Sequence, residues 1–135
     1  MQKELTKAYI AGLFDGEGII TLTYHSSKDE FRSPTVSMSN TSYELLDFIL
    51  KEYGGSIVKQ KVYKDHHKQS WSWRLKRRKA LNFLSDIAPY MKERTKLKRA
   101  KTLLNEYLKV TPRNGKYSEK MKVAKLAFEN DFFAS

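Results

Sequence analysis

Two acidic residues, Asp15 and Glu17, close a short run of apolar and small residues and are the strongest candidates for chemistry in this sequence. Apolar or small residues recur at helical spacing from Leu5 to Asp15, and Gly16 and Gly18 end the pattern. The free carbonyls at a helix C-terminus carry partial negative charge, so two acids there imply a counter-ion. Carboxylates at this spacing suit a hard divalent ion such as Mg²⁺. For such a pair taken alone, two solvated acids at a helix end are the commoner arrangement.

Small residues just before these acids favour the metal-site interpretation. Ala8 and Gly12 lie four residues apart and therefore share one helical face, with Ala11 beside them. Side chains this small let another backbone approach closely. We expect two such helices to touch and to bring two acidic ends together.

Charge and composition restrict the class of partner. The chain has 135 residues, 26 Lys and Arg against 15 Asp and Glu, and no Cys. The length fits one domain, and the excess of cations favours a nucleic acid, although charge does not separate DNA from RNA or a binder from an enzyme. Without Cys there is no disulfide, zinc–thiolate site or thiol nucleophile. With no secretory or membrane-spanning segment, we expect a soluble intracellular protein of the cytoplasm or an organelle matrix.

The pattern after the leading helix predicts an α+β fold in which two ββα units follow one another. The core is expected over about residues 5–109, with a C-terminal helical extension over about 116–133 within the same domain. The expected strands are Ile19 to Tyr24, Thr35 to Asn40, Ser56 to Tyr63 and Trp71 to Leu75; the expected helices after the first are Tyr43 to Tyr53, Lys79 to Ala88, Lys96 to Lys109 and one from near Ser118.

Alternation along these strands predicts a sheet with one covered and one open face. The apolar positions assigned to the covered face are Ile20, Leu22, Val36, Met38, Val58, Val62, Trp73 and Leu75. The opposite positions carry hydroxyls and cations, which can contact base edges and phosphates in a major groove, although a merely solvated face shows the same alternation. The candidate DNA-binding residues, including two from the first loop, are Thr21, Thr23, His25, Lys28, Arg32, Ser37, Ser39, Lys59, Lys61, Tyr63, Ser72, Arg74 and Lys76.

The segment from Ile10 to Gly18 resembles the nine-residue LAGLIDADG motif, with Phe14, Gly16 and Glu17 as substitutions common in that family. The expected order of helices and strands also resembles the family's αββαββα core. The resemblance therefore covers about residues 5–109 and implies the LAGLIDADG homing endonuclease fold, with an antiparallel DNA-binding sheet and additional C-terminal helices.

This resemblance implies roles for particular residues. Glu17 is the expected metal ligand, helped by the carbonyl of Gly16, with Asp15 in a supporting role and Mg²⁺ or Mn²⁺ as the ion. A basic active-site residue follows the Pro that ends the third helix, and counting from that Pro gives Arg94, with Lys96 as the alternative. A polar residue that orients water falls near Asn40.

A single copy of the motif implies a homodimer, because single-motif relatives pair their motif helices about a twofold axis. Ala8, Ala11 and Gly12 are the expected interface residues. The implied activity is metal-dependent double-strand cleavage of a long pseudo-palindromic DNA site. The alternatives are a non-cleaving DNA-binding regulator or an intron maturase of the same fold, for which the intron's own RNA is a partner, and, less favoured, an unrelated basic RNA-binding protein.

Overall fold

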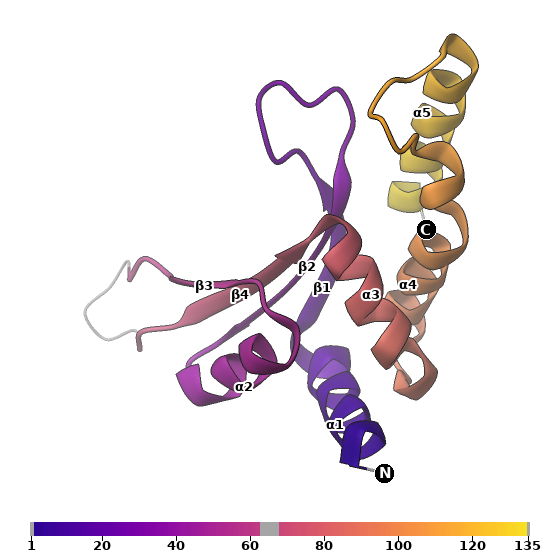
Figure 1. Ribbon diagram of the computed structural model, residues 1–135. Coiled ribbons are helices and arrows are strands. Elements are labelled where there is room, and N and C mark those ends of the chain that lie inside the picture. Colours follow the sequence, from indigo (N-terminus) through magenta and orange to yellow (C-terminus); the bar gives the residue numbers. More distant parts are fainter. Residues whose placement is uncertain (1, 63–67, 135) are drawn as a thin grey trace.

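A computed structural model describes residues 2–62 and 68–134 of the chain. Four helices of the core and a four-stranded sheet follow the predicted order, and a further helix lies at the C-terminus (Figure 1). The elements are α1 (Gln2–Glu17), β1 (Gly18–Thr23), β2 (Ser33–Asn40), α2 (Tyr43–Tyr53), β3 (Ser56–Lys59), β4 (Trp71–Lys76), α3 (Arg77–Ile87), the 3₁₀ turn η1 (Ala88–Tyr90), α4 (Arg94–Glu106), η2 (Leu108–Val110) and α5 (Glu119–Ala134).

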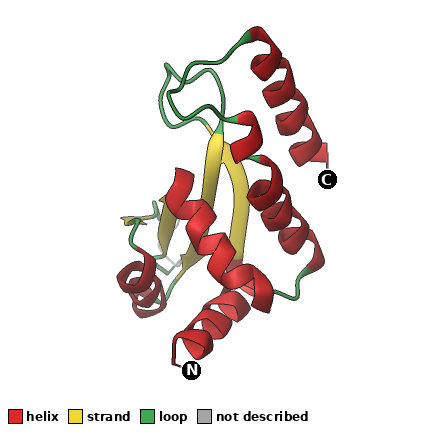
Figure 2. Cartoon of the chain, turned by 45° about the vertical axis from the view of Figure 1, so that its right-hand side comes forward, coloured by secondary structure: helices red, strands yellow, loops and turns green. Residues whose placement is uncertain are grey.

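The sheet is antiparallel throughout, with the strand order β1-β2-β4-β3. Helices α1 to α4 lie on one side of it, and α5 lies beyond α4 (Figures 1 and 2). Fully buried side chains from α1, α3 and the sheet fill the space between, with the rings of Phe14, Trp73 and Phe83 at its centre. Because these helices occupy one side alone, the other side of the sheet is not covered by any described helix.

The strand register confirms the predicted faces for β1, β2 and β4. Ile20 lies opposite Val36, and Met38 lies opposite Trp73, and all four side chains are buried. In β2 and β4, Ser37 lies opposite Arg74 and Thr35 lies opposite Lys76. Because side chains alternate along a strand, these four residues lie on the open face.

The predicted faces of β3 were wrong. Ile57 lies opposite Trp73 and packs against the core, whereas Val58 is 47% exposed and lies opposite Ser72 on the open face. Val62, which is 40% exposed, follows the end of the strand. Because Ile57 and Val58 are adjacent and both apolar, the sequence does not show which of them faces the core. The close approach of Gly55 to β4 determines the register. A Cβ on Gly55, which has a φ of +97°, would lie 2.3 Å from the backbone oxygen of Arg74.

The last helix, α5, is part of the hydrophobic core, whereas the sequence predicted only a C-terminal extension. Phe128 and Phe132 of α5 join the core, and Arg32, from the β1–β2 connection, donates to the Glu129 carboxylate at 2.8 Å. The α5 helix therefore holds the β1–β2 connection in place. Among the residues that the structure describes, no helix combines the length and apolar character needed to cross a membrane.

Lys125, on the inner side of α5, has a fully buried side chain. Its Nζ donates to Thr111 Oγ1 at 2.5 Å and lies 4.0 Å from the centre of the Tyr107 ring. Burial lowers the pKa of Lys125 from 10.5 to about 8, although Glu129 opposes the shift. The buried charge therefore destabilises the fold at pH values below this pKa.

We expect Lys125→Met to raise the free energy of unfolding at pH 7, by up to about 3 kcal/mol. Because the folded pKa lies below the unfolded one, the penalty is complete below about pH 8 and disappears as the pH rises towards 10.5. Urea unfolding of both proteins at pH 7 and pH 10 measures this difference. A gap between the two proteins that does not shrink at pH 10 would show that the charge is not the cause.

Candidate metal and nucleic-acid site

The C-terminal end of α1 is fixed to the start of α4 through Asp15. Its Oδ2 accepts a hydrogen bond from the backbone N–H of Lys92 at 2.7 Å, and its Oδ1 is buried without a hydrogen-bond partner. One oxygen is thus engaged and the other is closed to solvent. This hydrogen bond joins the end of α1 to the segment before α4, and the supporting role expected for Asp15 at a metal site stays a prediction.

Lys96 is the basic residue in contact with the motif helix. Its Nζ donates to the carbonyl oxygens of Asp15 at 2.6 Å and Phe14 at 3.3 Å. A cation at the C-terminal end of a helix is stabilised by the partial negative charge of the free carbonyls. Lys96 is itself held at the start of α4, where the carboxylate of Glu93 accepts from its backbone N–H at 2.6 Å. That hydrogen bond lowers the pKa of Glu93.

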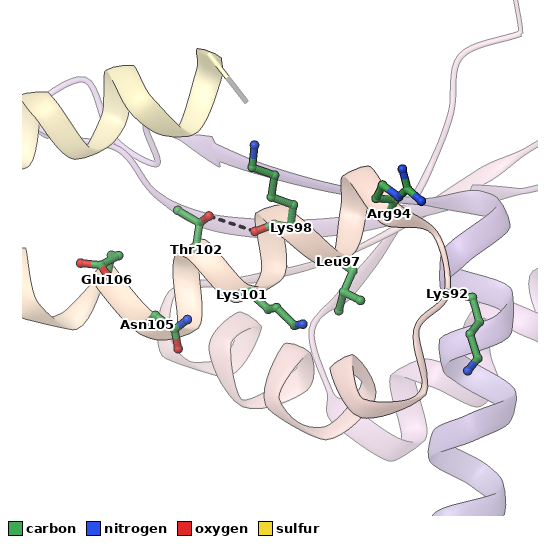
Figure 3. A pocket seen from close by; sticks show the side chains of 8 residues that line it. All are labelled: Lys92, Arg94, Leu97, Lys98, Lys101, Thr102, Asn105 and Glu106. Atoms are coloured by element: carbon green, nitrogen blue, oxygen red, sulfur yellow. Dashed lines mark hydrogen bonds between the residues drawn. The ribbon is translucent and has the colours of Figure 1, made fainter.

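Arg94, which counting from the Pro had placed first, lies elsewhere. It is exposed at the beginning of α4 and lines a shallow groove of about 600 Å³ together with Lys92, Lys98 and Lys101. Figure 3 shows the side chains of Arg94 and Lys98 pointing to one side of α4 and that of Lys101 to the other. Of the two candidates, Lys96 therefore occupies the position beside the acids, and Arg94 belongs to a basic surface next to them.

Glu17 is the acid that remains available at this end of α1. Both Glu17 and Gly16 are exposed. Among residues 2–62 and 68–134, no three His, Asp or Glu side chains come close enough to form a metal cage. A divalent ion with few protein ligands takes one or two carboxylates beside phosphate oxygens, and the exposed Glu17 fits that requirement. Binding would then depend on a phosphate group or a second copy of the chain.

Asn40 lies at the end of β2, next to the junction of α1 and β1. Met38 pairs with Gly18, so Asn40 is two residues beyond the partner of the first residue of β1. Its Oδ1 accepts from the backbone N–H of Ser42 at 2.7 Å and so closes the turn into α2. Its side-chain oxygen is engaged in this turn, and the water-orienting role expected for Asn40 stays a prediction.

The outer face of α1 contains two of the three expected interface residues. Gly12 is exposed and Ala8 is half-buried, while Leu5 and Tyr9 on the same face are 65% and 52% exposed. Ala11 is fully buried in the core of its own chain and is not part of this face. The outer face therefore consists of small and apolar side chains that the single chain leaves uncovered.

The open face of the sheet carries most of the predicted DNA-binding residues. The most accessible of them are Ser39, Arg74 and Lys76, whereas Ser72 is nearly buried. Thr21 and Thr23 on the edge strand β1 and Ser37 on β2 are half-buried. Each strand thus presents a short polar side chain or a cation on this side.

Other predicted residues are not on this face. Lys59 lies opposite Trp71, on the helix side of the sheet, and Lys61 is exposed beyond the end of β3. Burial, followed by the charges of Lys76 and Arg77, lowers the pKa of His25, which favours its neutral form. Three remain: Arg32 is paired with Glu129, Lys28 is exposed in the β1–β2 connection, and Tyr63 lies outside the described residues.

Strand alternation alone could have identified two further residues of the open face. Ile19 is 55% exposed beside Glu17, and Thr35 is bonded to Thr23, with 2.6 Å between their hydroxyl oxygens. No sequence signal indicated Gln60. Its side chain is held by Ser70 and by Ser39, at 2.5 and 3.3 Å, so a fixed amide lies at the edge of the open face.

Several solved structures of homing endonucleases have the same fold. The chain aligns with I-CvuI in complex with its target, crystallised with calcium, at a TM-score of 0.75 and 18% identity, covering 98% of this chain and 83% of that chain. It also aligns with the archaeal intron-encoded I-Vdi141I complexed with DNA, at a TM-score of 0.60 and 19% identity over 96% and 83% of the two chains.

The LAGLIDADG homing endonuclease I-GzeII in complex with its DNA target gives a TM-score of 0.67 and 17% identity, over 96% of this chain and 44% of that chain. No model of a known protein family matches the sequence, and no curated protein is significantly similar to it. The expected fold is therefore confirmed as that of the LAGLIDADG homing endonucleases.

Proposed function

We propose that this chain is a homing endonuclease that cleaves both strands of a specific duplex DNA site as a homodimer with divalent metal ions. The observation that carries the proposal is the placement of an exposed carboxylate, Glu17, where the motif helix meets a sheet with an open, cationic face. The acid and the DNA-reading surface are adjacent because β1 follows directly after α1. The structural neighbours bound to DNA support the same assignment.

Glu17 and the carbonyl of Gly16 would hold the metal, together with phosphate oxygens of the DNA and the same residues of a second chain. Mg²⁺ is the expected ion, with Mn²⁺ as a substitute, and structures of I-CvuI with calcium or magnesium are consistent with such use. When bound, the metal supplies activation of water and neutralisation of charge on the phosphate. Asp15 ties the end of α1 to Lys92, which holds the backbone next to Glu17 in place.

Lys96 has a separate role at this site. Its ammonium is fixed against the α1 carbonyls, which places a positive charge next to the acids without forming an ion pair with them. A charge held in this way can stabilise negative charge on a phosphate without prior rearrangement. The cations of the α4 groove would contact the sugar–phosphate backbone on the adjacent side.

The outer face of α1 is the proposed contact between the two chains. Gly12 and Ala8 leave room for close approach of a second α1, and the exposed Leu5 and Tyr9 provide apolar area to bury. Pairing there brings two Glu17 side chains to one axis. The substrate is then a pseudo-palindromic duplex whose half-sites lie about one helical turn apart, roughly 20 base pairs in all.

Arg74 is the open-face residue best suited to read a base, because it is exposed and centrally placed opposite Ser37. We expect Arg74→Ala to cost about 1 to 3 kcal/mol at one base pair in each half-site and to relax the preference there. Arg74→Lys is the matched control, since it keeps the charge and removes the two-pronged hydrogen bonding. The measurement is the affinity of wild type and both variants for a panel of DNA sites that each differ at one base pair. Uniform weakening by Ala and full recovery by Lys would mean that Arg74 contacts phosphate alone.

Cleavage selection on a randomised duplex library, with Mg²⁺ and with EDTA, tests the function as a whole. We expect enrichment of one pseudo-palindromic site among cleaved molecules and none in EDTA. Retention of one sequence without cleavage would instead identify a DNA-binding regulator of this fold. Preference for an intron RNA over every duplex would identify a maturase.

A further inference from the structure

A basic pocket lies at the end of the sheet away from α1. It has a volume of about 870 Å³ and opens between the β1–β2 connection, the start of α3 and the segment before α5. Figures 1 and 2 show the two connecting segments side by side at this end. Six cations line this pocket: Lys28, Lys76, Arg77, Arg78, Lys79 and Arg113.

The two acids of the pocket do not neutralise these cations. Asp29 accepts hydrogen bonds from two backbone N–H groups of its own loop, and Glu30 pairs with Lys122 at 3.5 Å. In the described part of the chain, none of the six cations forms an ion pair. Several unpaired like charges around one cavity repel one another, and an anion within it removes that cost.

Lys125 adds a seventh positive charge behind the wall of the pocket. Its three neighbours Thr111, Tyr107 and Tyr117 all line the pocket, and its ammonium is fully buried. Within residues 2–62 and 68–134 it has no carboxylate at ion-pair distance, because Glu129 is engaged by Arg32. Glu129 compensates the buried charge of Lys125 only in part, and an anion in the adjacent cavity would stabilise that charge further.

The location of the pocket indicates which anion it receives. Lys76 belongs both to the open face and to the pocket lining, so the two basic surfaces are continuous. The pocket lies one strand length from Glu17, which is about 20 Å for the six residues of β1. At about 3.4 Å per base pair, this is about six base pairs along a duplex.

We propose that this basic pocket binds phosphates of duplex DNA beyond the stretch that the sheet contacts, an inference that rests on the proposed function. The bound groups are phosphodiesters, recognised by charge and without regard to base. The pocket therefore adds affinity and length to the site and no sequence preference.

Binding of two duplexes in EDTA tests the proposal. One, the core duplex, is limited to the central twelve or so base pairs, about six on each side of the twofold axis, and the other is extended by about five base pairs at each end. We expect wild type to bind the extended duplex about tenfold more tightly. The double variant Arg78→Ala/Arg113→Ala should lose this advantage and keep wild-type affinity for the core duplex. Lys120→Ala, an exposed cation on α5 outside the pocket, is the control and should retain the advantage. Each lost phosphate contact should reduce the slope of log affinity against log salt concentration by about 0.9.

Equal affinity of wild type for both duplexes, or an undiminished advantage in the double variant, would overturn the proposal. Competition by millimolar inorganic phosphate with no effect of duplex length would make the pocket a site for a small free anion, and stronger binding of single-stranded RNA there would assign it to RNA. Thermal unfolding checks that the double variant is folded. Failure of wild type to bind the core duplex at all would refute the proposed function itself, whereas loss of the length effect alone refutes this inference.

Discussion

Replacement of Glu17 by Gln is expected to reduce DNA cleavage to below about one thousandth of the wild-type rate while leaving DNA affinity within a few-fold. The amide keeps the shape of the side chain and removes the charge that holds a hard cation. Glu17 is exposed and forms no contact that the fold needs, so the variant should unfold at the same temperature as wild type. Cleavage of a supercoiled plasmid carrying the selected site, over a range of Mg²⁺ concentrations, measures the effect.

Asp15→Asn is the matched control for this variant. Its amide oxygen can still accept from the backbone N–H of Lys92, so the end of α1 stays attached to α4. We expect a loss of less than about tenfold, because this side chain positions the site without binding the ion. Nicking at a near wild-type rate by Glu17→Gln, or an equally large loss in both variants, would remove Glu17 from the role of metal ligand.

Replacement of Gly12 by Val is expected to abolish cleavage without destabilising the isolated chain. A Cβ built on Gly12 meets no atom within 4 Å, and the residue lies on the exposed face of α1. In a paired dimer the added atoms would enter the seam from both chains, and overpacking of this kind costs about 1 to 3 kcal/mol at each site. Because the proposed mechanism brings both Glu17 side chains to one axis, a small separation of the helices should reduce cleavage far more than folding.

Sedimentation at micromolar concentration should show wild type as a dimer of 15.8 kDa chains and Gly12→Val as a monomer or an inactive dimer. Gly18→Ala provides the contrast. A Cβ there would lie 2.3 Å from the Phe14 ring, so that variant should lose stability within the single chain. A wild-type monomer on DNA, or normal cleavage by a Gly12→Val dimer, would show that α1 is not the contact between chains.

The sequence was most informative where a pattern depended on local geometry. The motif helix, the helix from Tyr43 to Tyr53 and the faces of β1, β2 and β4 follow from periodicity, because each pattern spans several turns or alternations. Alternation did not predict the faces of β3, because Ile57 and Val58 are adjacent and both apolar. The close approach of Gly55 to β4 sets the register there.

Contacts between residues distant in the sequence were not predictable in this way. Arg32 was assigned to DNA from its loop position, yet it pairs with Glu129, 97 residues later. Counting from a proline placed Arg94 ahead of Lys96, but which side chain turns towards α1 depends on the orientation of α4. The packing of Ala100 and Leu103 in the core and the bond from Lys92 to Asp15 hold α4 in its orientation, and no local sequence pattern reveals that bond.

The separation of the two faces of the sheet bears on how such a protein evolves. Ser39, Arg74 and Lys76 are accessible and lie opposite the side that packs against the helices, so their replacement removes no core contact. Surface substitutions of this kind usually change stability by no more than about 0.5 kcal/mol. If these residues read DNA as proposed, lineages could accumulate changes at them and drift towards new target sites one base pair at a time. Thr35, which is buried and bonded to the half-buried Thr23, is less free to vary.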